Sequence, residues 1–596
     1  MRNRFAQLLP AALLIAAGGL YAQPQFRRLP VKEYRDKMIA GWVGQMVGVT
    51  WGLPVEFRFN DEKVPQSMVP HWDPVQINDA LTNDDVFNDS RLLYLVDKFG
   101  LAITSRQAEM ERWRVWGPNG RLPLLSGIAP PDLYRRNPQV PVRQNLGFQI
   151  SADVLGLLAP GLPNTTISLA ERLNDPYGDV LYSGQFMAAM YGEAFFERSP
   201  ERVIAAGLRA IPEGSTYAEM VRQVVGWHAE YPHDWDKAWQ LVHDRYPAPE
   251  APGRGRGAQE QLNMDVLRNG GYVLLGLLYG DGDLDRTIVD AMRGGDDADC
   301  NPANAAGVLF TTIGYSKLPE RFRYPIDGDV LMTYDYARQR GVLTYPQILE
   351  KTEALARAAV VQAGGRIEKD AAGEEVFVIP VIAPKPSQLY RAGDAIPQTG
   401  SKFTAEEMAA IRGTAGAPAE FQKRAPGWTA SANCQMGFLP YVNYRENVFL
   451  SYAADDRTPC TLTRDFAVPA DGSSTLLDLL VSHPADGAFV LVAKVDGQEV
   501  LHLNINQGAA AAVATQYDPP WMHGVADLTP WAGKTVKLEV AGQPGRWNNP
   551  TVYWGRVAID SSSAVGEKRG LGLWDNSGDS FKRIHEQTAR PRNRNQ

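Results

Sequence analysis

Apolar positions recur at intervals of three and four residues along the chain between about residues 34 and 361. In the segment SGQFMAAMYGEAFFE, for example, Phe186, Met190 and Ala194 fall on one stripe of a helix. This period is typical of amphipathic α-helices, whereas the alternating runs typical of strands are scarce here. The pattern therefore predicts an all-α domain, to which we assign residues 23–384.

Two of the expected helices are rich in small residues. The segment KMIAGWVGQMVGVTWG places Ala40, Gly41, Gly44 and Gly48 at helical spacing, and the segment NPANAAGVLFTTIGY begins with a run of Ala and Gly. A stripe without large side chains lets another backbone approach closely. We therefore expect both helices to be tightly packed against neighbours.

The hydrophobic pattern changes in the C-terminal part of the chain. The segment RIEKDAAGEEVFVIPV predicts a small hairpin, and residues 385–427 are rich in Pro, Gly and Ala, which suits a linker. Short alternating runs separated by turns then follow: ENVFLSY, TLTRDFAVP, TLLDLLVSH, AFVLVAKVDGQEVL, TVKLEVAG and TVYWGRVAI. Together with turn signals such as Asp496-Gly497, these runs predict a jelly-roll-like β-sandwich over residues 428–562, followed by a tail at 563–596.

The N-terminus has the pattern of an export signal. Arg2 and Arg4 precede the apolar run LLPAALLIAAGGL, and Ala22 follows at the distance expected of a cleavage site. We expect residues 1–22 to be a removed signal peptide and the protein to be secreted or periplasmic. The apolar run is short for a bilayer span, and no second run of spanning length follows, so we expect no membrane anchor.

Composition and cysteine content narrow the classes further. The chain has 596 residues, 44% of them hydrophobic, and a formal net charge of -8, with no basic block in its body. These values predict a multidomain globular protein and argue against nucleic acid as a partner. Of the three cysteines, Cys434 and Cys460 lie in the predicted sandwich, where a disulfide and two buried thiols are both open.

The first acidic cluster lies in LTNDDVFNDSRLLYLVDKFG. Asn83 can cap a helix whose first turn holds Asp84 and Asp85 and whose end is marked by Gly100. The positive end of the helix dipole favours acidic residues at this position by itself. Capping alone therefore remains an alternative to a functional role for this pair.

The second acidic cluster is GGDDADCN, where Asp296, Asp297 and Asp299 occupy three of four positions. We expect Pro302 to begin the next helix, whose small residues predict tight packing that draws these aspartates inward. Buried carboxylates without compensation cost several kcal/mol each, and a hard divalent cation bound by oxygen ligands would remove that cost. A solvated acidic loop is the alternative.

Two other metal sites are excluded by their spacing. The segment DGDLDRTIVDAM begins like an EF-hand loop but has Arg286 where glycine is required and Met292 where glutamate is required. No two of the eight histidines lie at ligand spacing on one helix face, which argues against zinc.

Three motifs together resemble the ADP-ribosylglycohydrolase family: a Gly-rich helix running into GLPVEF, NDD at a helix start, and the late GDDADCN. The family pattern has P-x-E after the first helix, a Thr-Asp-Asp triplet, and a late Asp-x-Asp-Thr or Asp-x-Asp-Cys-Asn motif. The resemblance covers roughly residues 34–360. It implies an all-α fold with a dinuclear metal centre, typically Mg²⁺ and in some members Mn²⁺, that cleaves a glycosidic bond of a ribofuranose.

The resemblance also implies roles for individual residues. Glu56 matches the glutamate after the first helix and is the expected general acid/base. The expected metal ligands are Asn83, Asp84, Asp85, Asp297 and Asp299, with Mg²⁺ as the first choice and Mn²⁺ or Ca²⁺ as alternatives.

Three positions depart from the family pattern. Asn83 replaces a hydroxyl ligand, Cys300 lies where many members have a metal-binding threonine, and Gln45 lies where many have aspartate. A thiol is a poor ligand for Mg²⁺. One or two bound metals therefore both remain open.

Two further aspartates are candidate substrate contacts. Asp153 and Asp179 lie near Gly-rich turns in stretches that resemble exported, multidomain members of the family. The alternative for each is a helix cap or a turn aspartate.

The expected function is that of an exported, divalent-metal-dependent glycoside hydrolase that cleaves an O- or N-glycosidic bond, with furanosides among the candidates and a saccharide as partner. One alternative is a catalytically weakened carbohydrate-binding protein that holds a structural cation, and another is a metal-dependent phosphoesterase. In the sandwich, the aromatic residues are candidate platforms for sugar rings or ordinary core residues: Trp521, Trp531, Trp547, Tyr553 and Trp554.

Overall fold

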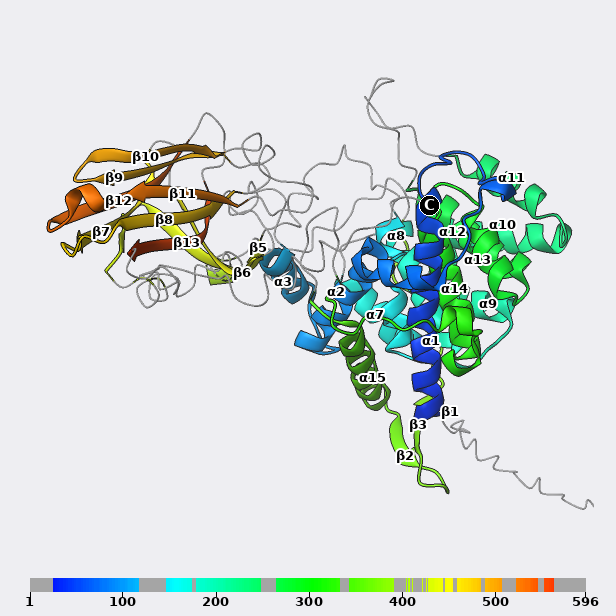
Figure 1. Ribbon diagram of the computed structural model, residues 1–596. Coiled ribbons are helices and arrows are strands. Elements are labelled where there is room, and N and C mark those ends of the chain that lie inside the picture. The colour runs from blue at the N-terminus through cyan, green and yellow to red at the C-terminus, as the bar shows by residue number, and fades with distance from the viewer. Residues whose placement is uncertain are drawn as a thin grey trace, which may run out of the picture.

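A computed structural model of the chain contains a helical region and a separate β-sandwich (Figure 1). It describes residues 25–116, 146–173, 178–247, 264–332, 342–390, 427–442, 445–453, 458–483, 488–505, 521–544 and 551–561, together with single positions between 404 and 425. Each region has its own hydrophobic core of buried side chains. The predicted combination of an all-α domain and a sandwich is confirmed.

The helical region is built around α1 (Val31–Gly52), which lies against α14 (Cys300–Ile313) (Figure 1). The other helices are α2 (Asp84–Phe99), α3 (Ser105–Trp116), α6 (Asp153–Leu157), α7 (Pro163–Leu173), α8 (Asp179–Ala194), α9 (Pro200–Arg209), α10 (Thr216–Glu230), α11 (Trp235–Arg245), α12 (Val266–Gly280), α13 (Leu284–Met292) and α15 (Tyr345–Gln362). Short 3-10 turns connect them, among them η1 (Leu53–Val55) after α1 and η3 (Pro74–Thr82) before α2.

The contact between α1 and α14 depends on glycine. A Cβ atom added to Gly44 would lie 2.5 Å from the carbonyl oxygen of Ala306, and one added to Gly52 would lie 2.1 Å from that of Ala298. Backbone thus touches backbone along the antiparallel pair, with Gly48 in a similar contact, while Gly41 faces the side chains of Thr311 and Leu157. The expected tight packing of both small-residue helices is confirmed, and it brings the end of α1 beside the start of α14.

A small antiparallel sheet packs at one end of the helical region, with the strand order β1-β3-β2. β2 (Arg366–Lys369) and β3 (Glu375–Pro380) form the predicted hairpin. β1 (Phe26–Pro30) pairs with β3 and leads directly into α1. The two ends of the predicted domain therefore meet in one sheet.

The sandwich consists of two five-stranded sheets, with the orders β10-β9-β12-β7-β4 and β11-β8-β13-β6-β5. Its strands are β4 (Thr429–Ala430), β5 (Cys434–Val442), β6 (Arg445–Ala453), β7 (Cys460–Ala467), β8 (Thr475–Ser482), β9 (Phe489–Val495), β10 (Gln498–Ile505), β11 (Met522–Asp527), β12 (Thr535–Pro544) and β13 (Val552–Ser561). Each alternating run of the sequence is a strand, and Asp496 and Gly497 form the turn of the β9–β10 hairpin with φ of 49° and 81°.

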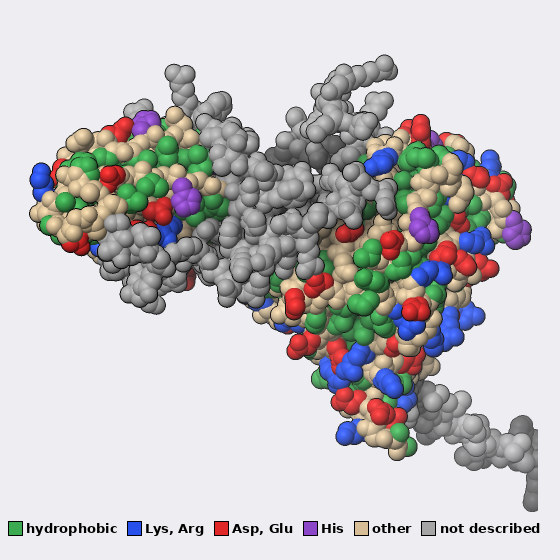
Figure 2. Space-filling model, in the orientation of Figure 1, with side chains coloured by type: hydrophobic (Ala, Val, Ile, Leu, Met, Phe, Trp, Pro, Cys, Tyr) green, Lys and Arg blue, Asp and Glu red, His purple; other side chains and the backbone are tan. Residues whose placement is uncertain are grey.

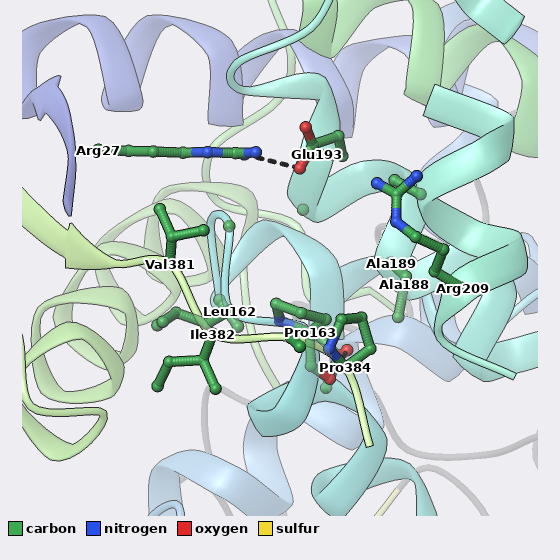
Figure 3. A pocket seen from close by; sticks show the side chains of 16 residues that line it. Arg27, Leu162, Pro163, Ala188, Ala189, Glu193, Arg209, Val381, Ile382 and Pro384 are labelled. Carbon is green, nitrogen blue, oxygen red and sulfur yellow. Dashed lines mark hydrogen bonds and ion pairs between the residues drawn. The ribbon is translucent and has the colours of Figure 1, made fainter. Parts of the chain in front are cut away.

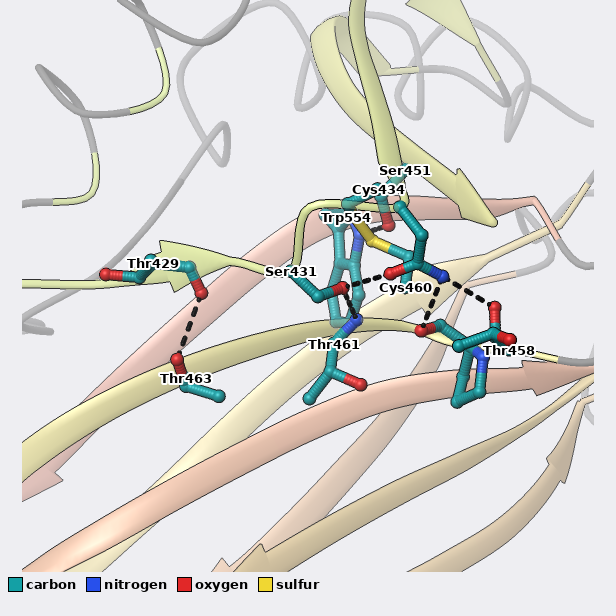
Figure 4. Close-up of a disulfide and its surroundings, with 11 residues drawn as sticks. Thr429, Ser431, Cys434, Ser451, Thr458, Cys460, Thr461, Thr463 and Trp554 are labelled. Atoms are coloured by element: carbon teal, nitrogen blue, oxygen red, sulfur yellow. Dashed lines mark hydrogen bonds between the residues drawn. A yellow bond between two sulfur atoms is a disulfide. The ribbon is translucent and has the colours of Figure 1, made fainter. Parts of the chain in front are cut away.

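Cys434 and Cys460 form a disulfide between β5 and β7, so the pairing left open by the sequence is present (Figure 4). Near it, the indole nitrogen of Trp554 donates a hydrogen bond to the Ser451 hydroxyl, 2.8 Å away (Figure 4). Trp554 is 0% exposed, so it is a core residue and not a sugar platform. Trp521 and Trp531 are half-buried, and Trp547 lies outside the described residues.

The surface of the helical region carries acidic and basic side chains intermixed (Figure 2). Among the described residues, no helix combines the length and the apolar character that crossing a membrane requires. The predicted signal peptide at 1–22 and the predicted tail at 563–596 lie outside the described residues. The other domain limits proposed from the sequence also stay predictions.

Candidate metal centre

Three chain segments bring carboxylates together in the helical region. Glu56 follows η1 at the end of α1, Asp84 and Asp85 begin α2, and Asp297 and Asp299 precede α14. We call these five residues the acidic centre. The glycine contacts between α1 and α14 place the first and third segments side by side, because Gly52 touches the backbone of Ala298 and Asp299.

The ligand atoms of the acidic centre are close enough to share an ion. One oxygen each from Glu56, Asp297 and Asp299 lie within 4.8 Å of one another. A second group, made by Asp85, Asp299 and the Cys300 thiol, meets the same limit. Asp299 belongs to both groups and therefore lies at the middle of the arrangement.

Helix capping fixes the two aspartate pairs. Asn83 caps α2 by accepting a hydrogen bond from Asp85 N–H at 2.8 Å, and its amide nitrogen donates to Asp299 Oδ2 at 3.2 Å. Asp299 caps α14 by accepting from Cys300 N–H at 2.9 Å. Because Asp299 supplies this cap, α14 begins at Cys300, two residues before the predicted start at Pro302. Asn83 and Asp299 thus cap their helices and also lie among the converging carboxylates.

Asparagine and cysteine side chains line the centre. The Cys300 thiol donates to Asp85 Oδ1 at 3.1 Å, and Asp297 N–H donates to Asn269 Oδ1 at 3.3 Å. Asn301 donates to the same Asn269 oxygen at 2.9 Å. Asn269 on α12 has no counterpart among the residues chosen from the sequence, since a lone asparagine within a long apolar helix carries no motif.

Two acceptor atoms of the centre are buried without a hydrogen bond from any described residue. Asp85 Oδ2 and Asp297 Oδ1 have no hydrogen-bond partner among the described residues, although the two residues are only 1% and 2% exposed. Carboxylate oxygens of this kind are the donors that Mg²⁺, Mn²⁺ and Ca²⁺ prefer. The donor set therefore fits a hard divalent cation, and the single thiol is its one soft member.

Burial and mutual repulsion change the protonation of the centre. Burial first, then the charges of Asp299 and Asp84, raises the pKa of Glu56 to about 9. Burial and Asp299 raise the pKa of Asp84 to about 6, and the pKa values of Asp85 and Asp297 lie well above the usual range for the same reasons. Such shifts are the expected consequence of several carboxyl groups in one buried site.

A second buried carboxyl pair lies next to Gln45, at the position where many members of the resembled family have aspartate. The Gln45 amide nitrogen donates to Asp89 Oδ2 and, at 3.4 Å, to Asp153 Oδ2. Tyr191 donates to Asp153 at 2.7 Å, and Asn304 donates to both of its oxygens at 3.0 Å. Asp89 is a functional candidate that sequence reasoning missed, although its spacing of four from Asp85 on the same helix face was a usable signal.

The two aspartates predicted to contact substrate lie in different surroundings. Asp153 is 1% exposed and enclosed by the groups just described, so a substrate could reach it only after these contacts change. Asp179 is half-buried at the start of α8 and accepts a hydrogen bond at 2.8 Å from Tyr217 N–H, which lies in the first turn of α10. A substrate role for either residue stays a prediction.

A cavity of about 320 Å³ lies elsewhere, between α7, α8, α9 and the segment that follows β3 (Figure 3). Arg27 and Glu193 form an ion pair at its edge at 2.7 Å, while Val381, Ile382 and Pro384 make an apolar wall (Figure 3). The residues that line it include no member of the acidic centre.

Comparisons with known proteins agree with the motifs. The model of the ADP-ribosylglycohydrolase family matches residues 30–346. Among solved structures, a chain described as "ADP-ribosylglycohydrolase-related protein complex" is 15% identical, with 55% of this chain and 99% of that chain covered. Its TM-score of 0.34 is too low to support an argument. The curated proteins contain no match.

Proposed function

We propose that this chain, which belongs to the ADP-ribosylglycohydrolase family, is an exported glycoside hydrolase that depends on a divalent cation. The bond cleaved is an O- or N-glycosidic bond of a saccharide, with furanosides as the first class to test. The observation that carries this proposal is that Asp299 lies within ligand distance of Glu56 and Asp297 in one group and of Asp85 and Cys300 in another.

Asp85 and Asp297 each have a buried oxygen without a hydrogen-bond partner in the part of the chain that the structure describes, which supports a cation in the acidic centre. Asp299, which belongs to both ligand groups, would hold it together with these residues and Asp84. A divalent ion bound there would supply Lewis acidity and a binding point for sugar hydroxyls. Mg²⁺ is the first choice because nearly all donors are carboxylate oxygens.

Glu56 is proposed to move the proton. In the protein without a cation, burial and the charges of Asp299 and Asp84 raise the pKa of Glu56 to about 9, and burial would continue to favour the protonated carboxyl group that a general acid requires. Glycosidic cleavage passes through an oxocarbenium-like transition state, and protonation of the leaving oxygen lowers that barrier. The neighbouring carboxylates would stabilise the positive charge that develops on the sugar ring.

The proposed site of action rests on the N-terminal sequence. Export is favoured by Arg2, Arg4 and the apolar run before Ala22. Outside the cell interior, glycans are more abundant than nucleotide-derived protein modifications. The disulfide between Cys434 and Cys460 supports an oxidising compartment. The appended sandwich is proposed to bind or orient a saccharide, although its role as a simple packing partner is the alternative.

The test is sugar release from a panel of aryl pyranosides and furanosides, measured with Mg²⁺, with chelator, and after Mg²⁺ is restored. Asp297→Asn and Glu56→Gln should each abolish release, while the exposed Glu213→Gln serves as a matched control that retains it. Undiminished release in chelator would remove the cation from the mechanism.

A binding protein that holds a structural cation is the second candidate. It is favoured by Cys300, whose thiol occupies a ligand position, and by Asn83, which turns its amide nitrogen toward Asp299. Cation binding and saccharide binding without sugar release would support this candidate. Release of inorganic phosphate from aryl phosphates would instead indicate a phosphoesterase.

A further inference from the structure

The loop that carries Glu56 is tied to the loop that carries Asp297 and Asp299. We call residues 56–64 the Glu56 loop. Phe57 N–H donates to the carbonyl oxygen of Asp296 at 3.0 Å, and Asp296 N–H donates to the carbonyl oxygen of Phe59 at 3.0 Å. The Asp296 carboxylate also accepts from Asp61 N–H at 2.8 Å. A single residue, adjacent in sequence to Asp297, thus holds the Glu56 loop at three points.

The backbone at this junction adopts conformations that side chains disfavour. Phe57, Asp61 and Asp296 have φ of 51°, 62° and 56°, in the left-handed region. Such residues cost free energy and persist where the surrounding contacts enforce them. Glycine is also required at position 295, because a Cβ atom added to Gly295 would lie 1.9 Å from the carbonyl oxygen of Glu62. The two loops are therefore in direct backbone contact.

A buried arginine joins both loops from the side of α12. Arg268 is 0% exposed, and its Nε lies 2.9 Å from Asp296 Oδ2 while its Nη1 lies 2.7 Å from Asp61 Oδ1. Its Nε also donates to the Tyr272 hydroxyl at 2.9 Å. His243 Nε2 lies 3.3 Å from the same Asp61 oxygen. One guanidinium group thus bridges a carboxylate of each loop.

From these contacts we propose that Arg268, Asp296 and Asp61 are positioning residues that hold Glu56 at a fixed place relative to Asp297 and Asp299. The inference rests on the proposed role of Glu56 in proton transfer. Displacement of a catalytic group by about 1 Å can lower a rate about 100-fold, so a rigid link between the two loops has a direct chemical use. None of the three residues needs to touch the cation or the substrate for this function.

Asp61 allows the contact of Arg268 with the Glu56 loop to be removed with little risk to folding. Its side chain is 65% exposed, and its φ of 62° suits glycine and asparagine. Asp61→Gly and Asp61→Asn therefore remove the carboxylate that contacts Arg268 without backbone strain. Asp281→Gly is the matched control, because Asp281 is another exposed aspartate with positive φ, at the end of α12 and outside both loops.

The experiment combines hydrogen exchange, Mg²⁺ titration and steady-state kinetics on the full chain. In both Asp61 variants we expect amide exchange of the Glu56 loop to rise about 10-fold and kcat to fall about 10-fold or more. KM and Mg²⁺ affinity should remain unchanged, because the carboxylate ligands are retained. Asp281→Gly should match the wild-type protein in all four quantities.

Unchanged exchange in the Glu56 loop would overturn the proposed link, and faster exchange with unchanged kcat would overturn its positioning role. A fall in Mg²⁺ affinity equal to the fall in kcat would instead make these residues structural supports of the whole centre, which also contradicts the proposal. Should the wild-type protein release no sugar from any substrate, the proposed function fails on that result, and the exchange and titration data still decide the link between the loops.

Discussion

Gly48 of α1 lies so close to Pro302 of α14 that a Cβ atom on the glycine would be 2.4 Å from the proline carbonyl oxygen. This contact belongs to a line of glycines that ends at Gly52, beside Asp299. Because Glu56 follows four residues later, the separation of the two helices sets the separation of Glu56 and Asp299. Helix packing therefore determines the geometry of the acidic centre.

Gly44→Ala should destabilise the helical region by about 1–3 kcal/mol, because its new methyl group would meet the Ala306 backbone at 2.5 Å. Gly226→Ala in α10 is the matched control, since its methyl group would meet no atom of the described residues within 4 Å. The control should gain about 0.5–1 kcal/mol from helix propensity. Urea denaturation of both variants measures the difference, and equal effects would contradict the packing argument.

The protein without bound cation should lose stability as pH rises. Carboxyl groups with raised folded-state pKa values stabilise the fold below their unfolded pKa and lose that contribution as pH rises through the folded pKa. For Asp84 and Glu56 the folded values are about 6 and about 9, so the loss extends from about pH 4 to pH 9. For Asp84 alone it is on the order of 3 kcal/mol.

Thermal denaturation in chelator should therefore give a lower Tm at pH 8.5 than at pH 5.5. Added Mg²⁺ should raise Tm more at pH 8.5, because a cation binds the deprotonated carboxylates. A Tm in chelator that rises from pH 5.5 to pH 8.5 would contradict the raised pKa values that burial gives the carboxyl groups of the acidic centre.

Asp89→Asn should stabilise the protein, and more so at pH 8 than at pH 5. Burial and the charge of Asp153 raise the pKa of Asp89, so removal of one carboxyl group relieves a repulsion that grows with pH. The new amide oxygen can still accept from Val154 N–H. Gln45 Oε1, which has no hydrogen-bond partner within the described ranges, can accept from the new amide nitrogen after rotation. Denaturation at the two pH values measures the effect, and a loss of stability at pH 8 would show that Asp89 is needed as a charge.

Cys300→Ser should change the metal preference of the centre. Replacement of the thiol with a hydroxyl exchanges a soft donor for a hard one, beside the Asp85 oxygen that the thiol now contacts at 3.1 Å. Calorimetry should show tighter Mg²⁺ binding and Cd²⁺ binding weakened by about 10-fold. Cd²⁺ affinity that stays at the wild-type value would mean that the sulfur is not a ligand.

Much of the fold could be predicted from the sequence, because local signals and tertiary structure agree. Asn83 and Gly100 mark the two ends of α2 as expected, and each alternating run after residue 440 is a strand. Other features depend on distant segments and carry no local signal. β1 forms only because β3 is available to pair with it. The small residues of α1 predict a close neighbour, but they do not indicate that this neighbour is α14.

The residues of the acidic centre that belong to motifs could be predicted from the sequence. The residues that join it only through three-dimensional contacts could not. The three motif segments do converge, but Asn269 and Arg268 contribute from an apolar helix without any motif. Asp296 was singled out only as one acid of a cluster, although its contacts are with Arg268 and the Glu56 loop rather than with the cation ligands. Such a division of roles follows from three-dimensional contacts alone.

Diffraction from a crystal soaked in Mn²⁺, with the anomalous signal of manganese recorded, tests the central claim most directly. We predict a strong anomalous peak among the carboxylates of Asp85, Asp297 and Asp299, at coordination distances of about 2.0–2.4 Å. The peak should disappear in Asp297→Asn. A well-folded wild-type crystal with no manganese at these residues under saturating Mn²⁺ would contradict the account.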